Sequence, residues 1–299
     1  MREYKHLDTI PTGHASDVLT NGCLVLEGGA FRGLYTMGVL DYFMLHDLNM
    51  QTTIGTSAGA LCGFNYVAGQ IGRAAIVNLK HRHDSNYVGA RAFLEDGGIM
   101  GFTYLFNELS NEIPFDEEAF NNPARRFIAT TTNVETGKTE YFEKGKTDDI
   151  FKAIQASATV PYISRPVMIN DTPYLDGGIA TKIPLDWVLE ENFDKIVIVR
   201  TRDKSYRKEV RSPLEIARRA YKDYPEFKLA LVDEAPRYNV LLDRIDLLEQ
   251  QGRLFVLAPS VPVEISRFEG NLDNLGDLYQ LGMKDAEENF EKILAYLKK

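Results

Sequence analysis

A pentapeptide of small residues around Ser57 carries the clearest chemical signal in the chain. Ser57 lies between Gly55 and Gly59 in a Gly-Thr-Ser-Ala-Gly run. Such a Gly-x-Ser-x-Gly run between a strand and a helix is typical of a nucleophile elbow, a sharp turn that lifts the serine hydroxyl clear of a sheet. The helix that follows directs its amide dipoles at the reacting oxygen. The run predicts a nucleophilic serine, and a strand–helix turn used only for packing is the alternative.

A second glycine-rich run lies upstream, where residues 27–33 read Glu-Gly-Gly-Ala-Phe-Arg-Gly. A dinucleotide-binding loop needs glycine at the place of Ala30 and an acidic residue at the end of the next strand, and the sequence supplies neither. A Walker loop needs a Gly-Lys-Ser/Thr ending, which does not follow here. The remaining interpretation is an oxyanion hole, in which amides at a helix N-terminus face a negatively charged carbonyl oxygen. We expect the amides of Gly29, Ala30 and Phe31 to fill this role.

The histidine positions determine which base can serve Ser57. The chain has five histidines, and none lies beyond His83. An α/β-hydrolase triad places its histidine late in the chain, after the acid, so that triad is not expected. Asp176 lies late and is followed by Gly177 and Gly178. We predict that Asp176 is the base paired with Ser57, with an ordinary aspartate–glycine turn as the alternative.

The strands and helices that position Ser57, Asp176 and the glycine-rich loop are indicated by short apolar runs that alternate with amphipathic stretches. Strands are expected at residues 23–26, 52–54, 127–132, 139–142, 174–175, 195–199 and 253–257. Helices are expected over residues 33–48, 58–68, 151–157, 212–224, 226–250 and 273–298. This alternation predicts an α/β fold with a largely parallel sheet. The chemical motifs all precede about residue 190, and the remainder is a helix-rich extension whose last strand is expected at the sheet.

Composition and charge narrow the class of protein. The chain has 299 residues, 44% of them hydrophobic, and a net charge of −9. Its acidity argues against a nucleic-acid partner, because phosphates would repel it. Cys23 and Cys62 lie in apolar surroundings and are expected to be buried free thiols, and no Cys/His cluster has metal-ligand spacing. With no secretory signal and no bilayer-spanning apolar run, we expect a cytoplasmic protein, and contact with a membrane surface stays open.

Taken together, the motifs resemble the patatin-like phospholipase family, which uses a Ser–Asp dyad without histidine. The family's Gly-Gly-Gly-x-Arg-Gly loop is matched by residues 28–33, which include Gly28, Arg32 and Gly33, with Ala30 in place of the third glycine. Its elbow is matched by residues 55–59 and its Asp-Gly-Gly turn by residues 176–178, and the run over residues 156–161 is similar to its Ser-Ala-x-x-x-Pro segment. The match covers about residues 22–190. If the third position of the loop requires a positive φ, alanine there costs about 1 kcal/mol.

The resemblance implies a three-layer α/β/α fold, with a catalytic domain over residues 22–190 and a C-terminal α/β extension over 191–299 packed on the same core. It also implies a serine acyl hydrolase of lipid acyl esters that needs no cofactor and no metal. Ser57 would form the acyl-enzyme and Asp176 would carry the proton, while Arg32 would fix the loop or contact a substrate phosphate. Residues 99–115, rich in aromatic and apolar side chains, would line an acyl groove or form an interfacial segment, and plain core packing is the alternative. A non-catalytic lipid-binding protein with the same fold is the alternative function, and the sequence predicts no oligomeric state.

Overall fold

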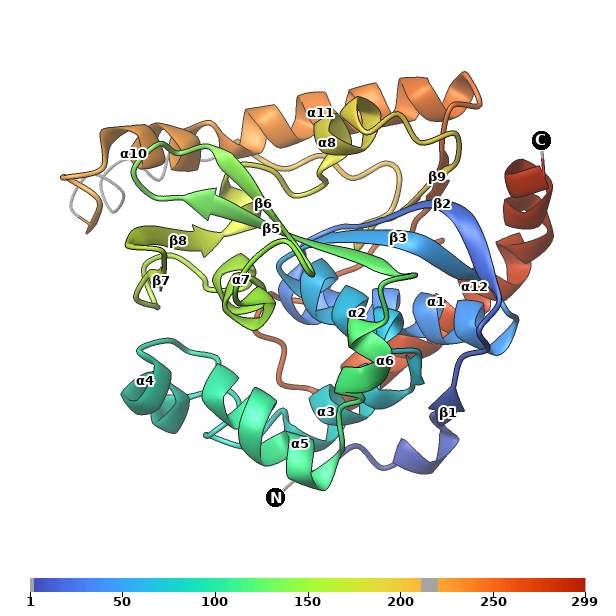
Figure 1. Ribbon diagram of the computed structural model, residues 1–299, viewed down its shortest axis with the longest axis horizontal. Helices are drawn as coiled ribbons and strands as arrows, with labels where there is room; N and C mark the ends of the chain where they lie inside the picture. The colour runs from blue at the N-terminus through green and yellow to red at the C-terminus, as the bar shows by residue number, and fades with distance from the viewer. Residues whose placement is uncertain (1–2, 211–219, 299) are drawn as a thin grey trace.

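A central sheet lies between two layers of helices in the computed structural model, which describes residues 3–210 and 220–298 (Figure 1). Within these residues the sheet has eight strands in the order β10-β9-β2-β3-β5-β8-β7, and β6 also pairs with β5. Its strands are β2 (Leu19–Leu26), β3 (Asn49–Thr56), β5 (Arg126–Asn133), β6 (Thr139–Glu143), β7 (Val167–Ile169), β8 (Thr172–Asp176), β9 (Ile196–Val199) and β10 (Phe255–Leu257). A small separate sheet joins β1 (Gly13–His14) to β4 (Gln70–Ile71).

Helices cover both faces of this sheet (Figure 1). They are α1 (Gly33–Leu45), α2 (Ala58–Val67), α3 (Arg73–His81), α4 (Ala90–Asp96), α5 (Leu109–Glu112), α6 (Glu117–Asn121), α7 (Ile150–Ser157), α8 (Leu185–Glu190), α10 (Pro225–Val232), α11 (Glu234–Gln250) and α12 (Leu272–Lys298). Helices α1, α2 and α12 cover one face, and α8 and α11 cover the other, while α3, α4 and α5 lie farther from the sheet. The predicted three-layer α/β/α fold is therefore confirmed. In the described ranges, no helix combines the length and apolar composition needed to cross a bilayer.

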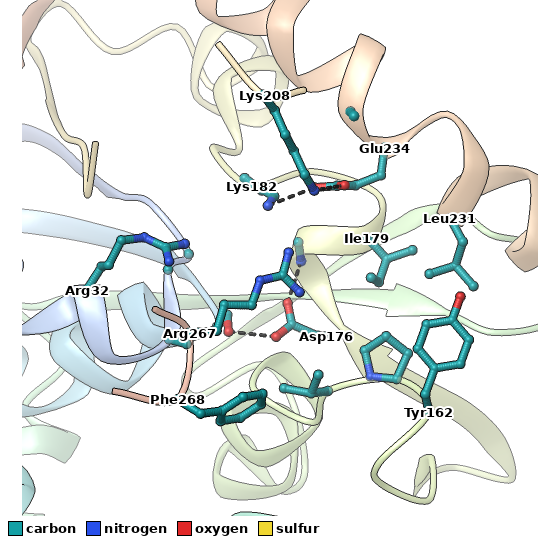
Figure 2. Close-up of a pocket in the computed structure, with 18 of the residues that line it drawn as sticks. Arg32, Tyr162, Asp176, Ile179, Lys182, Lys208, Leu231, Glu234, Arg267 and Phe268 are labelled. Atoms are coloured by element: carbon teal, nitrogen blue, oxygen red, sulfur yellow. Dashed lines mark hydrogen bonds and ion pairs between the residues drawn. The ribbon is translucent and has the colours of Figure 1, made fainter. Parts of the chain in front are cut away.

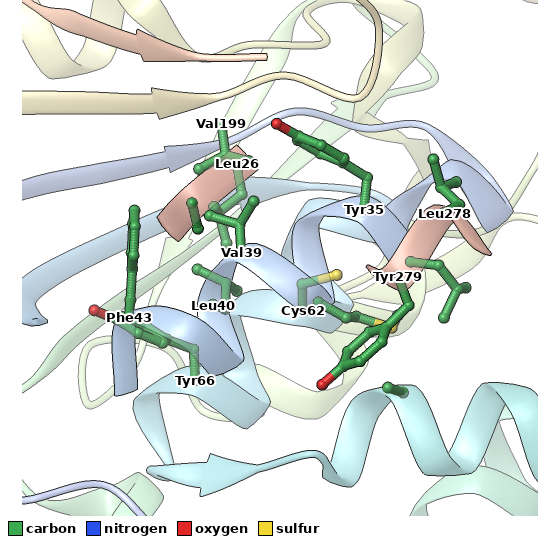
Figure 3. Close-up of a cluster of buried hydrophobic side chains, with 14 of the residues drawn as sticks. Leu26, Tyr35, Val39, Leu40, Phe43, Cys62, Tyr66, Val199, Leu278 and Tyr279 are labelled. Carbon is green, nitrogen blue, oxygen red and sulfur yellow. The ribbon is translucent and has the colours of Figure 1, made fainter. Parts of the chain in front are cut away.

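Strand β2 shows why the sheet needs both helical layers. Its side chains alternate between the two faces, so Leu24 and Leu26 pack in one core while Cys23 and Val25 pack in the other. All four side chains are fully buried. A strand that is apolar on both faces is typical of a parallel sheet covered on both sides. Figure 3 shows the first core, where strand residues meet α1 and the C-terminal helix α12.

The strand pairing agrees with most of the sequence analysis. Strands β10, β9, β2, β3 and β5 run parallel, as predicted, and the strand expected at residues 253–257 joins the sheet as β10. Strands β5 and β6 form the expected antiparallel hairpin. Strands β7 and β8 are antiparallel additions at the far edge. Thus the part of the chain after residue 190 supplies two strands of the main sheet.

Of the predicted helices, one is divided in two in the structure and another lies largely outside the described residues. The single helix expected over residues 226–250 is wrong, because the structure has α10 and α11 with a break at Asp233. Pro236, near the start of α11, has no N–H to donate to the carbonyl of Val232, so the hydrogen-bond ladder is interrupted there. The helix expected over residues 212–224 lies largely outside the described residues.

The segment over residues 99–115 packs partly in the core and partly lines a cavity, as two of the expectations for it proposed. Tyr104–Glu108 form a π-helix that leads into α5. Leu105 and Leu109 are buried in an apolar cluster with Val77 and Tyr87 of the preceding elements. Leu105 and Met100 also line an apolar crevice that reaches Ser57. The segment therefore contributes Phe102, Tyr104, Leu105 and Leu109 to the core, is exposed at several other positions, and forms a cavity wall at one side.

Helices α1 and α12 approach one another through two glycines. A Cβ atom on Gly282 of α12 would collide with the backbone carbonyl of Tyr35, and one on Gly38 of α1 would collide with that of Tyr279. The absence of side chains at both positions lets the two backbones come into direct contact. The C-terminal helix is thereby fixed to the helix that opens at the glycine-rich loop.

We predict that Gly282→Ala destabilises the protein by about 2 kcal/mol, the usual cost of forcing a methyl group into a packed core. Helix propensity alone would give a gain of about 1 kcal/mol for this change, so a loss identifies the collision. Urea unfolding monitored by circular dichroism measures the effect. Lys284→Ala on the exposed side of α12 is the matched control and should change stability little. A more stable Gly282→Ala variant would contradict the proposed contact.

Candidate functional site

The ends of two strands meet on one edge of β5 and bring Ser57 and Asp176 together. Residues 128–130 of β5 pair with both β3 and β6, and residues 131–132 pair with both β8 and β6. Strands β3 and β8 therefore follow one another along the same edge. Thr56, the last residue of β3, pairs with Thr130, and Asp176 pairs with Thr131. Two segments far apart in the sequence thus end next to each other.

Ser57 occupies a sharp turn between β3 and α2. Its backbone has φ 55° and ψ −121°, a conformation that L-residues adopt only where the surroundings impose it. A Cβ atom on Gly55 would collide with the backbone of Gly59, and one on Gly59 would collide with the carbonyl of Leu26. The two glycines therefore let strand and helix cross closely behind the serine. This is the geometry that the Gly-x-Ser-x-Gly run predicted.

The side chains of Ser57 and Asp176 are directly hydrogen-bonded. The Ser57 hydroxyl donates to Oδ2 of Asp176 at 2.6 Å, and the amide of Gly178 donates to Oδ1 at 2.7 Å. Only glycine fits at position 177, because a Cβ atom there would collide with the carbonyl of Thr130. Burial raises the pKa of Asp176, and the hydrogen bonds from Ser57 and Gly178 and the charge of Lys182 offset part of that rise. The carboxyl is thus a stronger base than an exposed aspartate.

The glycine-rich loop passes beside this pair. Ala30 has φ 50°, so the strained backbone considered for this position is present, at a cost of about 1 kcal/mol. The amide of Gly28 donates to the backbone carbonyl of Lys182 at 3.1 Å, and the amide of Arg32 donates to the backbone carbonyl of Gly29 at 3.2 Å. Within the described part of the chain, the structure gives no hydrogen-bond acceptor to the amides of Gly29, Ala30 and Phe31.

The loop is held by a carboxylate that the sequence analysis did not assign. Glu27, directly before Gly28, is buried and accepts hydrogen bonds from the Thr201 amide at 2.5 Å and from the Thr201 hydroxyl at 3.1 Å. It also accepts a hydrogen bond from the hydroxyl of Tyr238 on α11. The C-terminal part of the chain therefore fixes the start of the loop. An acidic residue within an otherwise apolar strand end is the only signal the sequence offers.

The second unassigned contributor is Ser157, at the end of α7. Its hydroxyl accepts a hydrogen bond from the Ser57 amide at 2.8 Å and donates to the carbonyl of Thr130 at 2.6 Å. The side chain thus ties the strained elbow to β5. The sequence analysis placed Ser157 in a family-like segment but gave it no role.

Two cavities meet at Ser57, one lined by both charged and apolar side chains and the other lined mainly by apolar ones. The larger, about 320 Å³, is lined by Asp176 and by charged residues that include Lys182, Lys208 and Glu234. Figure 2 shows these three charged side chains on one wall and Phe268 on the opposite one. The smaller, about 50 Å³, is an apolar crevice lined by residues that include Phe31, Met37, Leu61, Leu105 and Tyr87. The crevice and the larger cavity share Ala30, Ser57, Val160 and Phe268.

The charged groups in these cavities do not form a metal site. Among the described residues, no cluster of three or more His, Cys, Asp and Glu side chains could hold a metal ion. The site therefore offers a hydroxyl, a carboxylate and backbone amides, flanked by a larger cavity with charged side chains in its lining and by a small apolar crevice. Such a set can perform acyl transfer through a covalent serine intermediate.

Comparison with known proteins agrees with this architecture. Residues 24–189 match the model of the patatin-like phospholipase family, so the chain belongs to that family. Residues 224–298 match a second model, a domain of unknown function (DUF6363). The first match contains Ser57, Asp176 and the glycine-rich loop, whereas α11 and α12 lie in the second.

Curated relatives are distant. The chain is 28% identical over 192 residues to the uncharacterized protein YjjU of Escherichia coli, a match that covers 60% of this chain and 51% of that protein. It is 25% identical over 248 residues to the "Probable lipid hydrolase 463L" of Invertebrate iridescent virus 6, covering 75% of this chain and 82% of that protein. The chain thus matches about half the length of the first and most of the second.

Among solved structures, VipD from Legionella pneumophila aligns with a TM-score of 0.48 and 10% sequence identity. The alignment covers 97% of this chain and 73% of that one.

We predict that Ser157→Ala destabilises the protein by about 1–3 kcal/mol, because it leaves the buried Ser57 amide without an acceptor. Urea unfolding provides the measurement. Ser110→Ala is the control, because the Ser110 hydroxyl makes only a long 3.5 Å contact with Leu105. Equal stability of the two variants would show that Ser157 does not support the elbow.

Proposed function

We propose that the chain is a serine acyl hydrolase that cleaves acyl esters of lipids, with Ser57 as nucleophile and Asp176 as base. The observation that carries the proposal is the 2.6 Å hydrogen bond from the Ser57 hydroxyl to Oδ2 of Asp176. A base must lie within hydrogen-bond reach of the proton that it removes, and this contact meets the requirement without a histidine.

In the first half of the reaction, the Ser57 oxygen attacks the ester carbonyl carbon while its proton moves to Asp176. The carbonyl oxygen becomes negatively charged, and the amides of Gly29, Ala30 and Phe31 stabilise it. When the intermediate collapses, the alcohol leaves with the proton from Asp176. The acyl group stays on Ser57 as an ester.

In the second half, water attacks the acyl-enzyme and gives a proton to Asp176. Collapse of this intermediate releases the carboxylic acid and returns the proton to Ser57. One carboxylate thus acts as base and then as acid in each half. Its raised pKa supports both roles, because a proton acceptor works best when its pKa approaches the working pH.

The cavities support a lipid substrate. The apolar crevice beside Ser57 suits an acyl chain, and the larger cavity, whose lining includes charged side chains, suits the alcohol side of the ester. Membership of the patatin-like phospholipase family supports the same substrate class, as does the viral relative named a lipid hydrolase.

We predict that a fluorophosphonate probe labels the wild-type protein and fails to label Ser57→Ala. The same variant should lose about 10⁴-fold in the hydrolysis rate of a short p-nitrophenyl ester and of a phospholipid, because the nucleophile is gone. Gel fluorescence and a spectrophotometric assay measure the two effects. Ser110→Ala is the matched serine control and should be labelled like the wild type.

The same assays separate catalysis from lipid binding alone. The strained Ala30 is the feature that favours a non-catalytic lipid-binding protein. Absence of hydrolysis and labelling in the wild type, together with tight liposome binding, would replace the hydrolase proposal by that alternative.

We predict that Asp176→Asn abolishes hydrolysis and raises the free energy of unfolding near neutral pH. Burial raises the folded-state pKa of Asp176, so ionising it destabilises the fold above that pKa. As pH falls below the folded-state pKa toward the ordinary value of an aspartate, the carboxyl of the folded wild type takes up a proton, and the advantage of the variant should shrink. Thermal unfolding of both proteins across pH tests this. An advantage that grows as pH falls would contradict the raised pKa.

A further inference from the structure

A cationic recess lies beside the larger cavity at Ser57 and is formed largely by residues outside the match to the patatin-like family. We define it by Arg32, Lys182, Arg202, Lys208 and Arg267, which line a volume of about 330 Å³. It shares Gly28, Arg32 and Arg267 with the larger cavity, so the two are continuous. Arg202 and Arg267 lie in the C-terminal part of the chain.

Arg32 is the buried member of the recess. Its exposed fraction is only 7%, and its Nε has no hydrogen-bond partner. Among the described residues, the guanidinium forms no ion pair or hydrogen bond. Burial, together with the nearby charge of Arg202, lowers the pKa of Arg32 to about 10. An unpaired buried guanidinium is costly, and an anion in the recess would offset that cost.

Arg202 and Arg267 add unused donors to the same volume. Arg202 donates to the carbonyl of Val263 and lies over the ring of Tyr206 at 4.7 Å, but its Nε has no partner. Arg267 is exposed and, in the part of the chain that the structure describes, makes no ion pair. Its charge acts on both Arg32 and Asp176, which places it between the recess and the catalytic pair. Figure 2 shows the Arg267 guanidinium beside Asp176, with Arg32 farther away on another segment.

The acidic groups of the recess are largely engaged elsewhere. Glu27 accepts hydrogen bonds from Thr201 and Tyr238. Glu234 on the bordering wall pairs with both Lys182, at 2.7 Å, and Lys208. Burial and the neighbouring Lys182 lower the pKa of Lys208 to about 8, as expected where cations are crowded. Glu209 also lines the recess. A concentration of arginine in a chain with a net charge of −9 indicates a ligand with the opposite charge.

We propose that Arg202 and Arg267, together with Arg32, form a subsite for a phosphate group on the alcohol side of the substrate ester. The inference rests on the proposed hydrolase function and adds the residues that select the substrate. With the acyl chain in the apolar crevice, the alcohol side of the ester points into the larger cavity, which opens into the recess. A planar guanidinium group can donate two parallel hydrogen bonds to the oxygens of a phosphate, so arginines around one volume suit a phosphate group. The C-terminal part of the chain therefore determines which esters reach Ser57.

The test compares two soluble substrates, dihexanoylglycerol phosphate and dihexanoylglycerol, both as monomers. The measured quantity is the ratio of kcat/KM for the phosphorylated over the neutral ester. Arg267→Gln and Arg202→Gln should each lower this ratio about tenfold, the effect of losing one charge-assisted hydrogen bond. Arg91→Gln changes an exposed arginine on α4 that lies outside the recess, and it should leave the ratio at the wild-type value. An unchanged ratio in the first two variants, or an equal fall in Arg91→Gln, would overturn the subsite.

Binding to the Ser57→Ala variant gives a readout that does not depend on hydrolysis. Calorimetry should show tighter binding of the phosphorylated than of the neutral lipid, and adding Arg267→Gln should remove the difference. If the wild type hydrolyses neither ester while this difference persists, the function proposal fails and the subsite stands. Inorganic phosphate is the third ligand. Binding of phosphate alone as tightly as the phosphorylated lipid, with loss in Arg267→Gln, would overturn the assignment to a substrate head group.

Discussion

The register of strand β5 is the constraint on which the site depends. Two strands that run in opposite directions end at adjacent residues of β5, Thr130 and Thr131, and this adjacency places Ser57 against Asp176. A slip of one residue in either pairing would turn the side chains to the other face of the sheet and separate the pair. Gly177 also packs directly against β5, because a Cβ atom there would meet the carbonyl of Thr130. The short hydrogen bond is thus a consequence of backbone packing.

The site concentrates several unfavourable features that the surrounding structure must offset. Ser57 and Ala30 hold positive φ values, Asp176 is a desolvated carboxyl and Arg32 is a buried cation. Each of these costs free energy in the folded state. The compensation comes from the helical layers and from buried hydrogen bonds such as those of Ser157 and Glu27. Strain is retained where it orients reacting groups.

The motifs and the layered fold could be predicted from the sequence, whereas the hydrogen bonds that support the motifs from distant parts of the chain could not. The motifs around Ser57, Asp176 and the glycine-rich loop could be predicted, because their glycines indicate the tight backbone turns that each motif requires. The three-layer fold follows from strands such as Cys23–Leu26, apolar on both faces. The support from Ser157, Glu27 and Tyr238 could not be predicted, because a lone polar residue does not reveal the partner that folding brings to it. Pro236 is a signal for the break at Asp233, but the apolar pattern continues on both sides of it and led to the prediction of a single helix.

The placement of β9 and β10 has a consequence for how the chain folds during synthesis. Cys23 of β2 pairs with Ile196 of β9, so the second edge of β2 stays open until the chain has been made well past the catalytic motifs. Glu27 likewise waits for Thr201 and Tyr238 before its carboxylate is satisfied. Contacts this distant in sequence form slowly, and they close the sheet only at a late stage. A nascent chain that already contains Ser57 and Asp176 therefore still lacks the framework that shapes its glycine-rich loop, so the order of synthesis itself delays the maturation of the site.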